Sequence, residues 1–149
     1  MAKRRSLDTD RCPVARSLDV MGERWALLIV RDAFDGMRRF GEFQKSLGVA
    51  RNILADRLRN LVDANILETK PASDGTSYEE YVLTPKGRGL FPVIVGLRQW
   101  GEAHLYGAGD AHSVMLEHAS GKPIQSMTLQ DAQGQALGPD DVWVKKTTD

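Results

Sequence analysis

One side of a helical pattern between residues 50 and 64 carries side chains that can bond nucleic-acid bases. At about 100° per residue, these polar positions are Asn52, Asp56, Arg59 and Asp63, with Arg51 near the start of the helix. An Arg side chain can donate to O6 and N7 of guanine, and an Asn side chain can bond N6 and N7 of adenine. Arg59, two turns further along, is placed for a backbone phosphate, and Asp56 for a cytosine amine or a neighbouring Arg. The chemistry expected of this side is therefore recognition of double-stranded DNA.

The opposite side of the same pattern is apolar, which predicts packing against a core: it carries Leu54, Leu58 and Leu61, flanked by Ile53 and Val62. Just upstream, a shorter helix is predicted, with Phe40, Phe43 and Leu47 on its apolar side. Gly48 can end this helix in a left-handed conformation. Two helices joined by so few residues must cross steeply, as in a helix-turn-helix. An ordinary pair of core helices with a solvated polar face is the alternative.

The residues that follow predict a β-hairpin, with strands over 66–70 and 77–83 and a turn at Ser73-Asp74-Gly75-Thr76. A helix-turn-helix followed at once by a hairpin is the winged-helix arrangement. The hairpin, or wing, carries Lys70, which is a candidate phosphate contact. Asp74, Glu79 and Glu80 lie around it in the sequence, so its hold on DNA is expected to be weak.

Two further helices are predicted upstream. Pro13 suits the first turn of a helix over 12–22, because its missing N–H costs nothing there. The segment 23–35 is apolar almost all round, which predicts the central helix of the core. Arg38 and Arg39 then begin the first helix of the DNA-reading pair, where two guanidiniums and a helix N-terminus could hold a phosphate. An exposed basic loop is the alternative.

After the hairpin, Thr84 and Pro85 predict the start of a helix that continues to about residue 106. Pro92 lies inside it and should kink it, because its ring removes one backbone hydrogen bond and crowds the preceding turn. Apolar residues recur along this helix at Leu90, Phe91, Ile94, Leu97 and Leu105. One face of a small domain needs less apolar surface than this, so we expect pairing with a second copy in a two-fold homodimer.

Length and charge limit the class of protein. A chain of 149 residues allows one domain with appendages. No apolar run reaches the length of a membrane span and no signal-peptide pattern begins the sequence, so a cytoplasmic protein without membrane contacts is expected. The formal net charge is zero, but residues 1–60 hold 13 Lys+Arg and 8 Asp+Glu, whereas residues 61–149 hold 7 and 12. The N-terminal part therefore suits a polyanion.

Several ordered motifs resemble the HxlR-type winged-helix transcriptional regulators of bacteria, which are related to the MarR-type regulators. The motifs are Cys12-Pro13-Val14, Gly22-Glu23-Arg24-Trp25, Arg38-Arg39-Phe40-Gly41-Glu42-Phe43, Ala50-Arg51-Asn52-Ile53-Leu54 and Leu83-Thr84-Pro85-Lys86-Gly87-Arg88. The resemblance covers residues 12–101 and implies a fold that is mainly α with a β wing (α+β). It also implies a homodimer joined through its first and last helices, acting on palindromic DNA. One departure is Ala50, where many relatives have a Ser that can cap the helix.

Cys12 is the single cysteine, which excludes an internal disulfide and a multi-cysteine metal site. The resemblance implies that such an N-terminal cysteine serves as a thiol sensor in some members of the family. Its position at a helix start, near Arg11 and Arg16, favours the thiolate. An inert, buried Cys12 is the alternative. The sequence also leaves room for a small-molecule effector.

Three segments are expected: a basic N-terminal arm over 1–11, the winged-helix domain over 12–106, and an appendage over 107–149. In the arm, Lys3, Arg4 and Arg5 either lie along phosphates or serve only as a solubilising tail. The appendage predicts short strands at 114–116, 124–129 and 142–144, and it is similar to the zinc ribbon that some relatives append. Its cysteines are missing and His118 alone cannot hold zinc. A metal-free β appendage packed around Trp143 is therefore expected.

No catalytic site, metal or cofactor is expected. His104, His112 and His118 lack the paired spacing of helical metal ligands, and no Ser or Cys stands in a nucleophile motif. Two hypotheses remain, a DNA-binding regulator and a winged-helix module that binds protein instead. The acidic wing and Ala50 are the arguments for the second.

Overall fold

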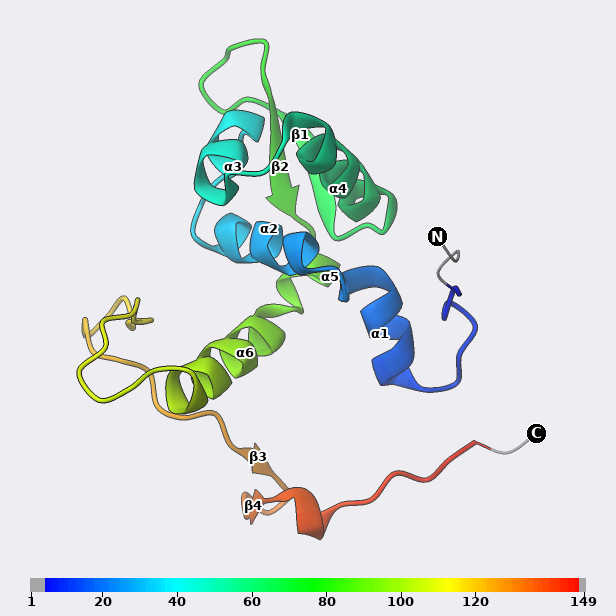
Figure 1. The fold of residues 1–149 in the computed structure, drawn as a ribbon, viewed down its shortest axis with the longest axis vertical. Helices are drawn as coiled ribbons and strands as arrows, with labels where there is room; N and C mark the ends of the chain where they lie inside the picture. Colours follow the sequence, from blue (N-terminus) through cyan, green and yellow to red (C-terminus); the bar gives the residue numbers. More distant parts are fainter. Residues whose placement is uncertain (1–4, 148–149) are drawn as a thin grey trace. The chain divides into compact units, whose positions relative to one another are not determined.

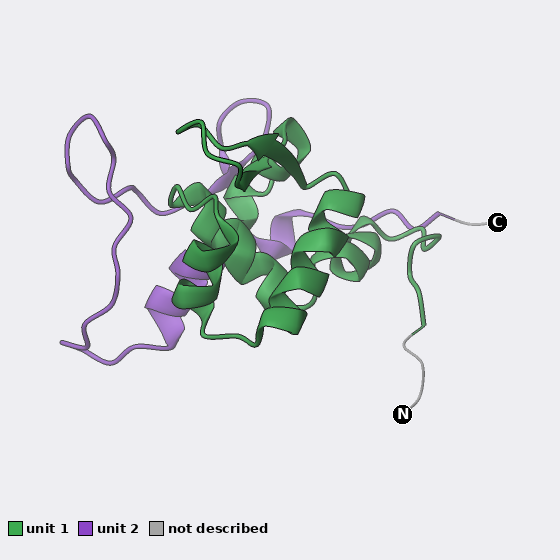
Figure 2. Ribbon diagram, turned by 90° about the horizontal axis from the view of Figure 1, so that it is seen from above, with its two compact units in different colours: residues 1–94 green, residues 95–149 purple. Residues whose placement is uncertain are grey.

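The computed structural model describes residues 5–147, so Lys3 and Arg4 of the expected basic arm lie outside the described residues. In chain order its elements are α1 (Pro13–Met21), α2 (Arg24–Phe34), α3 (Phe40–Leu47), α4 (Arg51–Asp63), β1 (Leu67–Pro71), β2 (Glu79–Leu83), α5 (Pro85–Arg88), α6 (Phe91–His104), β3 (Leu129–Gln130), β4 (Ala136–Leu137) and the 3-10 helix η1 (Pro139–Asp141). They form two compact units, residues 1–94 and 95–149, which Figure 2 shows in separate colours. The division falls inside α6.

Helix α2 is the centre of the first unit (Figure 1). Ile29 and Val30 are fully buried, and α2 contacts α1, α3, α4 and β2. The side chain of Glu23, its N-cap, accepts a hydrogen bond from the Ala26 N–H at 3.1 Å, which satisfies one of the free donors of the first turn. The structure confirms the central helix that the sequence predicts.

Helices α3 and α4 are joined by a short turn that begins at Gly48. This glycine has a φ of +63°, the left-handed conformation in which a helix commonly ends. Phe43 of α3 and Leu54 and Leu58 of α4 are fully buried, which confirms the predicted apolar stripe. As Ala50 implies, no side chain caps the start of α4.

Strands β1 and β2 form the wing, an antiparallel pair in which Leu67 lies opposite Leu83. Thr84, which is buried, joins the wing to α5. Its hydroxyl donates to the Asn65 carbonyl at 2.6 Å and accepts from the Gly87 N–H at 3.0 Å. The helix-turn-helix with its hairpin confirms the predicted fold, mainly α with a β wing.

The prediction of a single kinked helix over 85–106 is wrong. The chain forms α5 and α6 separately, with an interruption at Gly89 and Leu90. Pro92 is the second residue of α6, a position at which a helix leaves its N–H group without an internal acceptor. The missing donor of Pro92 therefore costs nothing, and the proline marks the start of a new helix instead of distorting a continuous one.

In the second unit, polar contacts hold the tail against α6. Gln99 Nε2 donates to the Gln125 carbonyl at 2.9 Å, and Gln99 Oε1 accepts from the Met127 N–H at 2.7 Å. Arg98 Nη1 donates to the Ser113 carbonyl at 3.0 Å. None of residues 107–147 is buried, so this segment forms no hydrophobic core.

The tail carries a small antiparallel sheet, but the predictions of strands at 114–116 and over most of 124–129 are wrong, and so is the prediction that the tail packs around Trp143. Its sheet consists of β3 and β4, with a separate single bridge between Leu116 and Pro123. The segment 142–144 forms no strand, and Trp143 is 81% exposed. An apolar run forms a strand only where a neighbouring strand offers its backbone hydrogen-bonding groups, and here none does within the described residues.

Gly87 is the position where the first unit is least tolerant of added volume. A Cβ at residue 87 would lie 2.2 Å from the Ile66 carbonyl oxygen, and backbone atoms cannot easily move away. Gly87→Ala should therefore destabilise the protein by about 3 kcal/mol, the upper end of the usual cost of overpacking, as measured by urea unfolding. Gly41→Ala in α3 is the matched control, because a Cβ there meets nothing within 4 Å. Equal unfolding midpoints for the two variants would contradict this packing.

Candidate nucleic-acid interface

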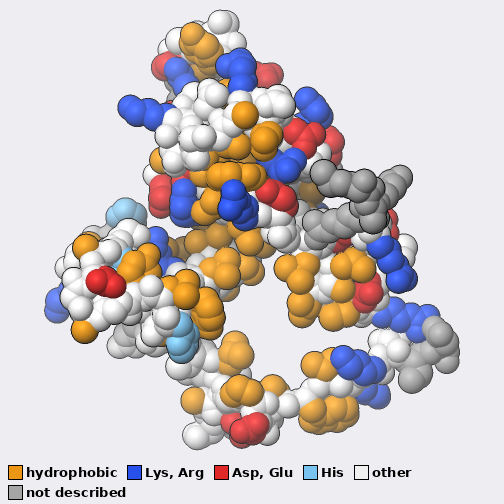
Figure 3. Space-filling view, in the orientation of Figure 1, with side chains coloured by type: hydrophobic (Ala, Val, Ile, Leu, Met, Phe, Trp, Pro, Cys, Tyr) orange, Lys and Arg blue, Asp and Glu red, His pale blue; other side chains and the backbone are white. Residues whose placement is uncertain are grey.

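The polar side of α4 is open to solvent along its length. Arg51, Asn52 and Arg59 are exposed, and Lys70 is exposed on the wing. Figure 3 shows Lys and Arg side chains at the end of the first unit that carries the wing, α3 and α4, with Asp and Glu side chains among them. The Arg51 guanidinium lies 4.8 Å from the centre of the Phe40 ring, and this cation–π contact orients it beside α3.

Arg38 and Arg39 do not form an isolated basic loop, because each contacts a carboxylate of the wing. Arg39 Nη2 donates to the Asp74 carboxylate, and its guanidinium lies 5.3 Å from the centre of the Tyr78 ring. Arg38 Nη1 lies 3.4 Å from Glu80 Oε2. We call these two ion pairs the wing latch. They attach the start of α3 to the hairpin.

The carboxylates of the wing latch remain charged at neutral pH. The Thr76 hydroxyl and N–H, with the Arg39 guanidinium, lower the pKa of Asp74 to about 2. Glu80 is 4% exposed, and hydrogen bonds from the Ser73 N–H and hydroxyl, both 2.9 Å, lower its pKa despite this burial. The hydrogen bond to Asp74 raises the pKa of Arg39 in turn.

A groove lies between α3, the start of α4 and the wing. It has a volume of about 690 Å³, and its lining combines the guanidiniums of Arg39 and Arg51 and the carboxylates of Glu42 and Glu79 with Phe40, Gln44, Tyr78 and Tyr81. Two guanidiniums beside aromatic rings suit the phosphates and sugars of a nucleic-acid strand. The groove therefore joins residues of α3, α4 and the wing into one surface.

Arg57 is a residue that the sequence analysis did not single out. Its Nε lies 3.0 Å from Glu23 Oε2 and its Nη1 2.6 Å from Asp56 Oδ2, and Asp56 Oδ1 lies 3.9 Å from Arg59 Nη1. A chain of charges thus runs from the N-cap of α2 to the exposed side of α4. In the sequence, Arg57-Leu58 is part of the resemblance to the HxlR-type regulators, and Arg57 flanks the Leu stripe. Its pairing with Glu23 is not predicted, because Glu23 is distant along the chain.

Cys12 is the N-cap of α1, and its thiol is exposed. Its N–H donates to Asp10 Oδ1 at 2.8 Å. This exposure contradicts the alternative of a buried Cys12 in the single chain.

No group of three or more His, Cys, Asp or Glu side chains in residues 5–147 could hold a metal ion. Within the same range, no helix combines the length and the apolar character that crossing a membrane requires.

The steeply joined α3 and α4, the exposed polar side of α4 and the adjoining hairpin define a winged helix-turn-helix protein. Residues 20–108 match the HxlR-like helix-turn-helix family, and the chain belongs to that family. The resemblance noted in the sequence is thereby confirmed.

Individual relatives agree with this assignment. Rv3095 of Mycobacterium tuberculosis, named an uncharacterized HTH-type transcriptional regulator, is 48% identical over 92 residues, which cover 62% of this chain and 58% of Rv3095. This chain therefore spans less than two thirds of that relative. The crystal structure of PA1607, described as a candidate transcription factor, is 48% identical with a TM-score of 0.90, covering 95% of this chain and 99% of PA1607. HypR in its reduced form, described as a redox regulator, is 30% identical with a TM-score of 0.58, over 63% of this chain and 94% of HypR.

The wing latch predicts an unusually acidic Asp74. An NMR titration should give a pKa of about 2 for its carboxyl group, below the ordinary 3.8. Because this pKa is depressed in the folded state, the stability contributed by the carboxylate is present above 3.8 and is lost as the pH falls toward 2. Thr76→Val and Arg39→Gln should each raise this pKa, since the first removes the hydroxyl hydrogen bond, which is the largest single cause, and the second removes the guanidinium, while the Thr76 backbone N–H remains in both variants. Thr9→Val is the control, and a parent Asp74 that titrates at 3.8 would show that the latch is open in solution.

Proposed function

We propose that this chain is a sequence-specific DNA-binding transcriptional regulator that acts as a homodimer on palindromic double-stranded DNA, with residues 12–106 as its working domain. The observation that carries the proposal is the two-sided structure of α4, which we call the recognition helix. Leu54 and Leu58 anchor one side in the core, while Arg51 and Asn52 stand exposed in its first turn. The N-terminal turn of such a helix is the part that enters the major groove in helix-turn-helix proteins.

The candidate contacts divide by the part of DNA that each can reach. Arg51 and Asn52 read base edges. Phosphates are assigned to the basic residues around them, namely Arg38, Arg39, Arg59 and Lys70. Asp56 lies 2.6 Å from Arg57 and 3.9 Å from Arg59, which supports its role in orienting an arginine.

The homodimer is supported by apolar side chains left exposed on the first and last helices of the domain. On α1, Val14 is 66% and Leu18 50% exposed, and Figure 3 shows hydrophobic side chains grouped over this helix. On α6, Leu97 is 52% and Trp100 59% exposed. Exposed apolar patches of this kind commonly mark association surfaces.

A winged-helix module that binds protein is the alternative. Salt dependence separates the two hypotheses, because DNA binding through phosphates weakens steeply as salt rises. A gel-shift series at increasing salt that shows no DNA binding even at low salt would favour the protein-binding module.

Asn52→Ala should relax base preference at one position of each half-site, at a cost of about 1–3 kcal/mol for a bidentate contact. Arg59→Ala should instead weaken all sequences about equally and flatten the salt dependence. Binding-site selection followed by anisotropy titration measures both effects. Half-sites should lie roughly 10 bp apart or a multiple of this.

The controls for this experiment come from the same chain. Asn60→Ala changes the same residue type on another side of α4, and Arg88→Ala removes an exposed charge from α5. Selected sites without two-fold symmetry, or an Asn52→Ala variant with the parent's base preference, would refute the assignment of α4.

The dimer proposal predicts that Leu18→Glu shifts the protein toward monomer, because it places a charge in the apolar surface of α1. Sedimentation at micromolar concentration should show a dimer for the parent. Arg16→Glu is the control, since residue 16 lies on the opposite side of α1 from Val14 and Leu18 at 100° per residue. A parent that is monomeric throughout, or equal effects of the two variants, would contradict the interface.

An exposed thiol at a helix start supports Cys12 as a redox sensor, and HypR is described as a redox regulator. Diamide or benzoquinone should release the parent from DNA and should leave Cys12→Ser bound, because serine lacks the reactive thiolate. Anisotropy with and without oxidant measures this difference. If the oxidant releases Cys12→Ser from DNA as readily as it releases the parent, Cys12 is not the sensor.

A further inference from the structure

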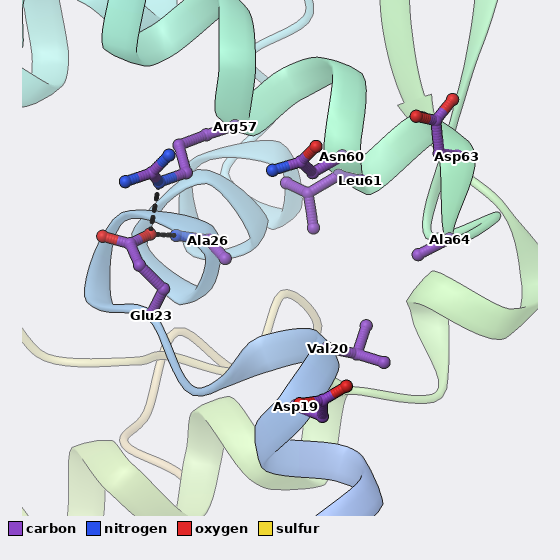
Figure 4. A pocket seen from close by; sticks show the side chains of 9 residues that line it. All are labelled: Asp19, Val20, Glu23, Ala26, Arg57, Asn60, Leu61, Asp63 and Ala64. Carbon is purple, nitrogen blue, oxygen red and sulfur yellow. Dashed lines mark hydrogen bonds and ion pairs between the residues drawn. The ribbon is translucent and has the colours of Figure 1, made fainter. Parts of the chain in front are cut away.

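A pocket lies between the C-terminal end of α1, the N-terminal end of α2 and the recognition helix (Figure 4). Its volume is about 560 Å³, within the range of sites for small organic molecules. Val20, Ala26, Leu61 and Ala64 supply apolar lining. The pocket thus has room and apolar surface for the body of a small organic ligand.

The charged groups of the lining favour a cation. Three carboxylates, of Asp19, Glu23 and Asp63, stand against one guanidinium, that of Arg57, so the net charge of the lining is −2. Among the described residues, Asp19 accepts hydrogen bonds from neutral donors, the Leu7 N–H at 3.0 Å and the Ser6 hydroxyl at 3.3 Å, and these bonds do not neutralise its charge. An anion entering this pocket would be repelled.

Arg57 does not reverse this preference, because two carboxylates already hold it. Its Nη1 lies 2.6 Å from Asp56, and its Nε lies 3.0 Å from Glu23. The Nε is buried, yet among the described residues its N–H forms no hydrogen bond. The same Glu23 oxygen also accepts from the Ala26 N–H. A ligand ammonium group can therefore compete with Arg57 for the Glu23 carboxylate.

The pocket and the proposed dimer surface lie on different sides of α1. Asp19 and Val20 line it from α1, whereas Val14 and Leu18 form the apolar dimer surface. At 100° per residue, these two pairs lie on nearly opposite sides of the helix. A dimer contact made by the Val14 and Leu18 side of α1 would therefore face away from Asp19 and Val20.

We propose that this pocket is an effector site for a small organic cation with an apolar body, such as an aryl amine or quaternary ammonium compound. By taking Glu23 from Arg57, the ligand loosens the recognition helix from the N-terminus of α2 and lowers DNA affinity. This regulatory step rests on the proposed DNA binding, whereas ligand binding by the free protein does not.

Calorimetry on the full chain tests the site with three probes of similar size: phenethylamine, benzyltrimethylammonium and 3-phenylpropionate. Both cations should bind with saturation below about 10 mM, and the anion should not. Asp63→Asn and Asp19→Asn should each weaken phenethylamine binding about fivefold through loss of one attractive charge. Asp35→Asn is the matched control, because Asp35 is exposed and lies outside the pocket.

Three outcomes would overturn the site. They are no saturable binding of either cation, equal binding of 3-phenylpropionate, or an Asp35→Asn effect as large as that of Asp63→Asn. Two carboxylate variants are used so that a folding defect in one leaves the other decisive.

The regulatory step is tested by measuring DNA affinity with and without the ligand, through fluorescence anisotropy on DNA obtained by binding-site selection. Saturating phenethylamine should weaken parent binding about fivefold or more. Arg57→Gln should bind DNA weakly from the outset and should not respond to the amine. If the amine fills the pocket in calorimetry but leaves DNA affinity unchanged, the coupling is overturned. If the protein binds no DNA, the proposed function fails while the calorimetric result for the site still stands.

Discussion

The packing of α4 against α2 is the interaction on which the rest of the first unit depends. Ile29 and Val30 of α2 and Leu54 and Leu58 of α4 have no exposed surface, and burying side chains of this size contributes roughly 1.5–3 kcal/mol each. This packing fixes the rotation of α4 about its own axis. Only one rotation buries the leucines, and it is the one that leaves the polar side free, so the same contacts that stabilise the core also present Arg51 and Asn52.

The wing shows why the residue types of a segment do not by themselves fix its role. From the sequence, Asp74 and Glu80 predict a weak hold of the wing on DNA. In the structure, they form the wing latch with Arg39 and Arg38, so their charge is largely compensated within the protein. A phosphate that approaches α3 must compete with Asp74 for the Arg39 guanidinium. Binding at this point is then an exchange of ion-pair partners, which favours a phosphate placed well enough to offset the lost pair.

The features that the sequence predicts correctly are those that depend on neighbours close in the chain. The Leu stripe of α4, the left-handed Gly48 and the hairpin all follow from local periodicity and turn chemistry. The sequence does not predict the break before Pro92, because a proline suits either a kink inside a helix or the first turn of a new one. The ion pair of Arg57 with Glu23 joins two helices that are distant in sequence, and no local pattern encodes such a pair.

Both units leave large apolar side chains in contact with water, which is unfavourable for a single chain. In the first unit, Val14 and Leu18 face solvent on α1, and in the second, Leu97 and Trp100 do so on α6 while Trp143 does so on the tail. The tail keeps its path through hydrogen bonds of Gln99 and Arg98, which have direction but remove little apolar surface from water. Hydrogen bonds of this exposed kind contribute only about 1 kcal/mol each, whereas burying one large aromatic side chain removes roughly 150–250 Å² from water. A second copy that covered apolar side chains of this size would remove more apolar surface from water than these exposed hydrogen bonds do, which is the physical reason that the exposed side chains of α1 and α6 support the proposed homodimer.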